Sequence, residues 1–160
     1  MIRLFHGSNA EVIVPDLSHS KPFKDFGKGF YLSDDEQQAW KMAFQKVRQT
    51  RLGKAEVSRF LFDETLLDAK ELNVLKFNDY SEEWALFVLQ NRNVNEIQPV
   101  HQYDIVYGPI ADDGVTYQLR RYQGGVISLS KLVEELKYAK GITFQYFFGS
   151  ERALRLLKKL

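Results

Sequence analysis

The spacing of apolar residues alternates along the chain between a strand-like and a helix-like pattern. Short apolar runs bounded by glycine, proline, asparagine or aspartate predict strands. These runs cover residues 2–5, 56–62, 72–77, 103–110, 115–122 and 142–148. Between several of them, apolar residues recur every three or four positions, which predicts helices with one buried face. The mixture predicts an α+β fold.

The first predicted helix begins just after Ser33. Ser33 with Glu36 three residues later is the pattern of a capping box, in which the two residues satisfy each other's backbone amides. Tyr31 therefore lies at the mouth of this helix. The helix is expected to bury an apolar stripe formed by Ala39, Trp40, Ala43, Phe44 and Val47.

Two further helices are expected in the second half of the chain. One begins after Ser81. The other begins after Ser128 or Ser130 and runs through Ala139 to a stop at Gly141, because serine favours the N-cap and glycine the C-terminal end.

Two predictions concern the turns near the end of the chain. The segment Asp-Asp-Gly at 112–114 is typical of a turn, and we expect it to join strands 103–110 and 115–122 in a hairpin. Ser150 is expected to cap a last helix over residues 151–160, which has leucines on one side and basic residues on the other.

Composition narrows the class of protein. The 160 residues, 44% of them hydrophobic, are enough for one domain with a buried core, and no repeat or linker divides residues 1–160. The chain has no cysteine, which favours a reducing compartment. No signal peptide and no apolar run of membrane-spanning length is present, so we expect a cytoplasmic protein without membrane contact. A net charge of +1 indicates no general attraction to nucleic acid.

Several common chemistries lack their motifs. Gly27 and Gly29 form a lone G-x-G, but residue 32 is leucine, so the Rossmann fingerprint fails. No Walker A motif is present, and the acidic residues 34–36 at the start of the first helix would repel a phosphate there. The three histidines, His6, His19 and His101, lack the spacing of a metal site, so no metal is expected. A G-x-S-x-G nucleophile motif is also absent.

Residues 7–30 form a long segment rich in serine, aspartate, proline and glycine. A structureless connection of this length is uncommon in a small domain and is usually functional. The segment ends in a paired-glycine turn followed by the aromatic ring of Tyr31. We therefore expect ligand contacts to concentrate there.

Two motifs in this part of the chain resemble a known superfamily. Residues 26–34, Phe-Gly-Lys-Gly-Phe-Tyr-Leu-Ser-Asp, resemble the second signature of the poly(ADP-ribose) polymerase branch of the ADP-ribosyltransferases. His6-Gly7-Ser8 resembles the first signature. Over nearly its whole length the chain resembles the bacterial family DUF3990, which is grouped with these enzymes and is often encoded in toxin–antitoxin loci. The resemblance implies a single-domain ADP-ribosyltransferase-like fold with split mixed β-sheets flanked by helices.

The resemblance also implies an NAD site. His6 would bind a ribose hydroxyl, the Gly7 backbone would pair with the nicotinamide amide, and Tyr31 would stack on the nicotinamide ring. Ser8, Gly29 and Phe30 complete the expected cofactor-binding residues. No metal is implied.

Gln145 occupies the position where the superfamily usually has a glutamate. Its amide oxygen can hold a ribose hydroxyl, but it carries no charge and cannot act as a base. Glu151, Asp112 and Asp113 are therefore candidates for a second carboxylate, although each also suits a turn or a helix start. Trp40 could form a second wall for the nicotinamide, although its place in the apolar stripe favours the core.

Two functions follow as hypotheses. In the first, the protein is an NAD-dependent mono-ADP-ribosyltransferase, a toxin with a macromolecular acceptor, protein or nucleic acid, and a small antitoxin protein as its partner. In the second, the absence of a glutamate at Gln145 marks a catalytically silent module that binds NAD or ADP-ribose or another protein.

Overall fold

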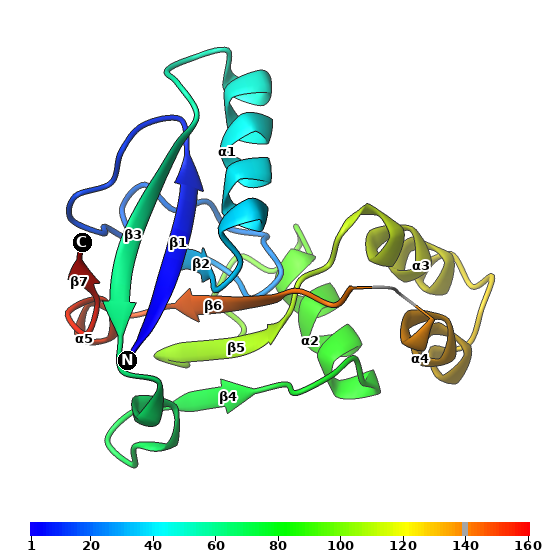
Figure 1. Cartoon of the computed structure of the whole chain (residues 1–160). Coiled ribbons are helices and arrows are strands. Elements are labelled where there is room, and N and C mark those ends of the chain that lie inside the picture. The colour runs from blue at the N-terminus through cyan, green and yellow to red at the C-terminus, as the bar shows by residue number, and fades with distance from the viewer. Residues whose placement is uncertain (139–140) are drawn as a thin grey trace.

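The computed structural model describes residues 1–138 and 141–160 and has an α+β fold (Figure 1). Its strands form one mixed sheet of seven in the order β4-β5-β6-β2-β1-β3-β7. Only β4 and β5 pair in parallel; the other neighbours are antiparallel. The strands are β1 (Ile2–Ser8), β2 (Phe30–Ser33), β3 (Glu56–Phe62), β4 (Val74–Lys76), β5 (Ile105–Pro109), β6 (Phe144–Phe148) and β7 (Lys158–Lys159). The α+β class with a mixed sheet flanked by helices is confirmed.

Side chains alternate between the two faces of the sheet and form a separate hydrophobic core on each. One core contains Leu4, Phe60 and Phe148. The other contains Val106 and Phe147 together with buried side chains of the helices over residues 82–92, 113–123 and 129–137 (Figure 1). The helices are α1 (Glu36–Thr50), α2 (Glu82–Arg92), α3 (Asp113–Gln123), α4 (Leu129–Lys137) and α5 (Glu151–Leu154), with a short 3₁₀ helix η1 (Glu64–Asp68).

The sheet has two halves, one formed by β4, β5, β6 and β2 and the other by β1, β3 and β7. They meet at a short junction between β1 and β2. These strands share a single register pair, Phe5 with Ser33, whereas β1 pairs with β3 along its whole length. Beyond that pair, the side chain of His6 bonds the carbonyl oxygen of Tyr31. A side chain thus joins the two strands where the backbone ladder has ended.

The predicted capping box at Ser33 is wrong. The N-cap of α1 is Asp35, whose carboxylate accepts hydrogen bonds from the backbone amides of Gln37 and Gln38. Ser33 lies on β2, where its hydroxyl accepts from the Asp35 amide and donates to the Phe144 carbonyl. Ser33 therefore takes part in the pairing of β2 with β6, whereas the local sequence alone predicts that it caps a helix.

The predicted buried stripe of α1 is only partly correct. Ala39 and Ala43 are buried, but Phe44 is 53% exposed, and Trp40 and Val47 are half-buried. A Cβ atom on Gly7 would lie 1.8 Å from the Ala39 carbonyl oxygen. The small residues thus bring the helix backbone against β1, and the larger aromatic side chains lie outside this contact.

The predicted strand over residues 115–122 is wrong, because the segment forms helix α3. The Asp112 side chain caps it by accepting from the Val115 amide, so the expected hairpin turn is a helix start. Val115 and Leu119, four residues apart, are both buried. The β-branched and aromatic composition is typical of a strand, but the spacing of the buried residues is that of a helix.

The predicted last helix is wrong over most of its length. Ser150 is the N-cap, but α5 ends at Leu154. The chain then returns to the sheet as β7, with Lys159 opposite Phe60, and the Leu160 amide donates to the Arg59 carbonyl. Leu157, which matches a helical stripe, instead enters the core from the turn after α5, and β7 covers the edge of β3.

The remaining elements follow their predictions more closely. The strand at residues 56–62 has the predicted bounds, and Ser81 and Ser128 are the N-caps of α2 and α4. Strand β1 extends three residues beyond its prediction. The helix predicted to run through Ala139 to a stop at Gly141 is shorter, because α4 ends at Lys137 with Tyr138 as its C-cap. Ala139 lies outside the described residues, and Gly141 has a φ of 70°. No helix of the described chain is long and apolar enough to cross a membrane.

Candidate functional site

His6 is held in a neutral form with one ring nitrogen bound. Its Nδ1 donates to the Tyr31 carbonyl oxygen at 2.7 Å, and its ring stacks on Phe30 at 4.3 Å. Burial lowers the pKa of His6 to about 4, and the charges of Lys46 and Lys24 contribute to the lowering. Because Nδ1 carries the proton, Nε2 is left as an acceptor. The arrangement suits a ligand hydroxyl that donates.

Tyr31 is fixed by the loop that precedes it. Its hydroxyl donates to the Gly27 carbonyl at 2.6 Å and accepts from the Phe26 amide at 3.0 Å, and burial raises its pKa well above the usual value. The ring packs edge-on against Phe147 at 5.3 Å. The Lys24 Nζ lies 5.1 Å from the ring centroid, so the ring already binds a cation.

Gly7 and Ser8 lie at the end of β1 against α1. The side of Gly7 on which a Cβ would stand is filled by the Ala39 carbonyl, so helix packing accounts for the glycine. A ligand could reach Gly7 only along its backbone edge. The buried Ser8 accepts a hydrogen bond from Lys46 Nζ at 3.1 Å.

Gly29 and Phe30 support the site from within the core. A Cβ on Gly29 would lie 2.0 Å from the Phe147 ring, so this glycine lets the loop pass over β6. Phe30 is 6% exposed and lies beneath the His6 ring. Its side chain therefore positions His6 and does not face outward.

Gln145 lies on β6, on the same face of the sheet as the Tyr31 ring. The register pairs Ser33 with Gln145 and Tyr31 with Phe147, which makes Gln145 a diagonal neighbour of Tyr31. Such neighbours lie about 7–8 Å apart. The structure thus brings together two residues that are far apart in the sequence.

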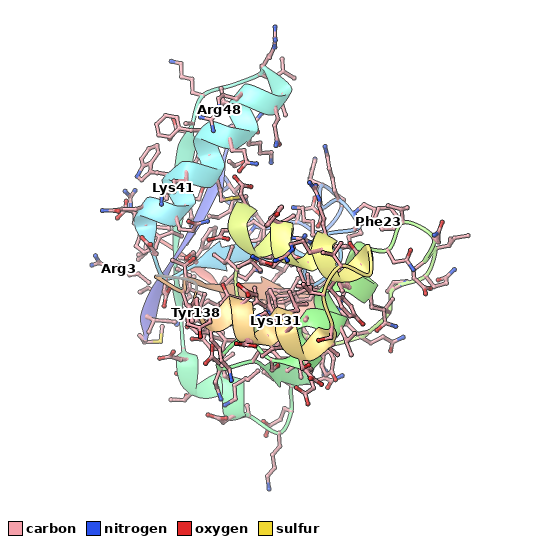
Figure 2. The ribbon with its side chains drawn as sticks, turned by 90° about the vertical axis from the view of Figure 1, so that its right-hand side faces the viewer. Arg3, Phe23, Lys41, Arg48, Lys131 and Tyr138 are labelled. Carbon is pink, nitrogen blue, oxygen red and sulfur yellow. The ribbon has the colours of Figure 1, made fainter. Side chains whose placement is uncertain are left out.

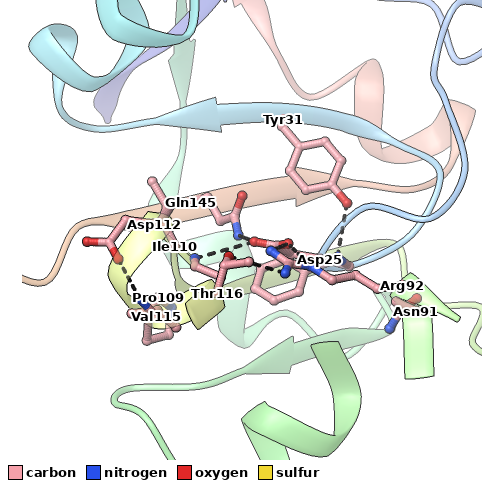
Figure 3. Close-up of polar contacts among 12 residues, drawn as sticks. Asp25, Tyr31, Asn91, Arg92, Pro109, Ile110, Asp112, Val115, Thr116 and Gln145 are labelled. Atoms are coloured by element: carbon pink, nitrogen blue, oxygen red, sulfur yellow. Dashed lines mark hydrogen bonds and ion pairs between the residues drawn. The ribbon is translucent and has the colours of Figure 1, made fainter. Parts of the chain in front are cut away.

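Asp25 orients the amide of Gln145 (Figure 3). Gln145 Nε2 donates to Asp25 Oδ2 at 3.2 Å. A carboxylate only accepts hydrogen bonds, so the amide nitrogen must face Asp25 and the amide oxygen must point elsewhere. Gln145 is 8% exposed, which favours a single orientation of this side chain.

Asp25 is itself tied to two helices. Its Oδ1 accepts from Arg92 Nε of α2 at 2.8 Å, and a second Arg92 nitrogen lies 2.6 Å away. Arg92 also donates to Thr116 of α3 at 3.3 Å, and the Ala111 amide donates to Asp25 Oδ2 at 3.4 Å (Figure 3). The Asp25 carboxylate therefore brings a negative charge, balanced by Arg92, beside Gln145.

Sequence reasoning missed Asp25 and Arg92 as site residues. Asp25 stands at the start of the glycine turn, but its partners lie 67 and 120 positions away. The only local signal for Asp25 was its position directly before the motif at residues 26–34. The pairing depends on the approach of the loop to α2 and β6.

The three carboxylates considered from sequence have structural positions instead. Asp112 caps α3, Asp113 is exposed in its first turn, and Glu151 is exposed in the first turn of α5. Within the described residues, none of them is hydrogen-bonded to Gln145. Trp40 lies against Phe44, with ring centroids 5.8 Å apart, and belongs to neither hydrophobic core.

Two shallow hollows lie away from these residues. One, of about 390 Å³, is lined by residues 75–81 and Glu83, and the other, of about 400 Å³, lies between η1 and Tyr107. Neither includes His6, Tyr31 or Gln145. Across residues 1–138 and 141–160, no group of three acidic or histidine side chains is arranged to hold a metal ion.

Comparison with known proteins identifies one family. The model of a protein family of unknown function, DUF3990, matches residues 2–159. No curated protein and no solved structure matches the chain. Because the match covers nearly every residue described above, this chain belongs to the DUF3990 family.

Proposed function

We propose that the protein is an NAD-dependent mono-ADP-ribosyltransferase. The observation that carries the proposal is the oriented amide of Gln145 beside Tyr31, with its oxygen directed away from Asp25. An acceptor oxygen fixed in this way suits a hydroxyl of the nicotinamide ribose. Transfer to one acceptor site, without polymer formation, fits a glutamine where the related enzymes usually have a glutamate.

His6 and Tyr31 take the remaining contacts to NAD. Nε2 of the neutral His6 accepts a hydrogen bond from a ribose hydroxyl, while Nδ1 continues to donate to the Tyr31 carbonyl oxygen. Tyr31 stacks on the nicotinamide ring, which is positively charged in NAD. The cation already placed over the Tyr31 ring supports this role, because the ring face attracts positive charge.

The reaction breaks the bond between the nicotinamide nitrogen and C1 of the ribose. The bonding electrons leave with nicotinamide, which becomes neutral, and the sugar develops oxocarbenium character. The acceptor group then bonds to C1 and releases its proton to solvent water. The Asp25 carboxylate, 3.2 Å from the Gln145 amide, stabilises the developing positive charge through Gln145 and does not serve as the base.

Incubation with NAD labelled in its adenylate half tests the proposal. We expect the protein to release nicotinamide and to label a component of a cell extract. Gln145→Ala and Tyr31→Ala should each lower both signals by about 10²-fold. Tyr31→Phe keeps the ring but loses the hydroxyl bonds to Phe26 and Gly27, so it should lower the activity less than Tyr31→Ala does. Protease and nuclease digestion of the labelled extract identify the acceptor class.

Asp25→Asn tests whether the carboxylate positions Gln145. An asparagine can turn its amide nitrogen toward Gln145 and so permits the reverse orientation of the glutamine amide. We expect kcat for nicotinamide release to fall about tenfold or more with little change in KM. A fall in kcat that only matches the loss of folded protein would instead indicate a structural role alone.

The second candidate function is binding without transfer. The uncharged Gln145 and the pairing of Asp25 with Arg92 favour it, because the carboxylate beside the Gln145 amide is already neutralised. Tight binding of NAD without nicotinamide release, in buffer and in extract alike, would support this function and contradict transfer.

A toxin role is the biological part of the proposal. It rests on the family resemblance to proteins of toxin–antitoxin loci. Induced expression in bacteria should stop growth, and Gln145→Ala should relieve the arrest. Co-expression of a small protein encoded beside the gene should do the same. Normal growth with active enzyme present would contradict the role.

A further inference from the structure

Two lysine ammonium groups converge on the His6 and Tyr31 side of the site. Lys46 extends from α1 and donates to the Ser8 hydroxyl at 3.1 Å. Lys24 extends from the loop before β2 and lies over the Tyr31 ring at 5.1 Å from its centroid. The charges of both lysines reach His6, where they help to lower its pKa. Two positive charges therefore lie beside the neutral His6 ring at one end of the site.

The two lysines have no ionic partner of their own. The ion pairs among the described residues include neither Lys24 nor Lys46. Asp25, next to Lys24, is paired with Arg92 instead. Burial lowers the pKa of Lys24, and the charges of Lys46 and Lys21 lower it further. Unpaired like charges held together are unfavourable, and an anionic ligand would relieve them.

The acidic start of α1 does not oppose an anion here. Lys46 lies ten residues beyond Glu36 on the same helix, which corresponds to roughly 15 Å at 1.5 Å per residue. At that distance, exposed charges are largely screened in physiological salt. The repulsion expected from the sequence applies to the helix N-terminus and not to this end of the site.

We propose that Lys24 and Lys46 bind the diphosphate of NAD, and that Lys24 leaves the Tyr31 ring when the nicotinamide stacks there. The inference rests on the proposed function and adds the anion site that the sequence could not place. A diphosphate bridge carries two negative charges at neutral pH, one for each lysine. The positively charged nicotinamide then replaces the Lys24 ammonium over the Tyr31 ring, and the displaced ammonium pairs with the phosphate.

Calorimetric titration with three probes tests the site: ADP-ribose, inorganic pyrophosphate and nicotinamide riboside. Lys24→Met and Lys46→Met should each weaken ADP-ribose binding about tenfold, and the double variant should lose pyrophosphate binding. Nicotinamide riboside has no phosphate and is itself a cation that displaces Lys24 from the Tyr31 ring, so its affinity should not fall in these variants. Lys24→Arg and Lys46→Arg should retain most of the affinity because they keep the charge.

Lys41→Met is the matched control, since this lysine also extends from α1 but points away from the sheet (Figure 2). It should leave all three titrations unchanged. Unchanged ADP-ribose binding in the double variant, an equal loss in Lys41→Met, or no binding of any probe to the parent protein overturns the proposed site.

The same variants separate this inference from the proposed function. Lysine-dependent pyrophosphate binding in a protein that releases no nicotinamide supports the anion site and contradicts transfer. Nicotinamide release that the double variant leaves unchanged supports transfer and contradicts the anion site.

Discussion

At the scale of single residues, His6 shows how a fold selects one chemical form of a side chain. Its ring is buried against Phe30, and this burial lowers its pKa to about 4 although the Nδ1 bond to the Tyr31 carbonyl acts in the opposite direction. At neutral pH the ring is uncharged, and Nε2 accepts hydrogen bonds. NAD affinity should therefore be flat between about pH 6 and 8, unlike that of a site that uses a histidine with an ordinary pKa near 6.5.

The same burial makes stability depend on pH. Between about pH 6.5, the pKa of an unfolded histidine, and about pH 4, the folded pKa of His6, only the unfolded chain binds the proton. Stability is therefore fully present above this window and decreases as the pH falls through it. His6→Gln should reduce the loss between pH 7 and 4 by about 1–3 kcal/mol in urea denaturation. Equal losses in both proteins would contradict a buried neutral ring.

At the scale of elements, Gly7 sets the distance between α1 and β1. Gly7→Ala would place a Cβ 1.8 Å from the Ala39 carbonyl, in the backbone of a helix that cannot shift one atom alone. We expect a loss of about 3 kcal/mol or more in the free energy of unfolding. Thermal or urea denaturation measures it.

Gly114→Ala is the matched control for Gly7→Ala. Gly114 lies in the first turn of α3, and a Cβ there meets only the Asp112 carboxylate at 3.4 Å. Alanine should stabilise this helix by up to about 1 kcal/mol. A tolerated Gly7→Ala would show that α1 moves freely against the sheet.

At the scale of the whole molecule, Asp104 ties the C-terminal segment to the sheet. The carboxylate is 3% exposed and accepts from Arg152 Nε at 2.7 Å, from the Ser150 hydroxyl at 2.6 Å and from the Asn73 amide at 2.8 Å. The Arg152 hydrogen bonds, with smaller contributions from the Ser150 and Asn73 bonds, lower the pKa of Asp104 to about 2. One side chain thus joins the start of β5, the approach to β4 and the cap of α5.

The hydrogen bonds of Asp104 predict that the protein loses part of its stability in acid. The folded pKa of Asp104 is below the unfolded value of about 3.9, so its contribution is present above about pH 4 and is lost as the pH falls through about 2. Because Arg152 is 60% exposed, solvent screening reduces the contribution to about 1–2 kcal/mol. Asp104→Asn should lower stability at pH 7 and have a smaller effect at pH 2.5. Equal destabilisation at both pH values would contradict the linkage.

The sequence by itself determined the features that depend on interactions between residues close together in the chain. Hydrophobic alternation defined the strand at residues 56–62, serine caps marked the starts of α2 and α4, and the apolar periodicity established the α+β class. The motif residues His6, Tyr31 and Gln145 were also visible in the sequence, although their roles remain proposals.

Only the tertiary structure decided which of two local possibilities was realised. Residues 115–122 have strand composition and helical spacing, and burial of Val115 and Leu119 selected the helix. The end of the chain matches a helix, but the open edge of β3 selected a strand. The contacts of Gln145 with Asp25 and of Lys46 with Ser8 join residues 120 and 38 positions apart. Such contacts form when packed elements meet, and no local propensity encodes them.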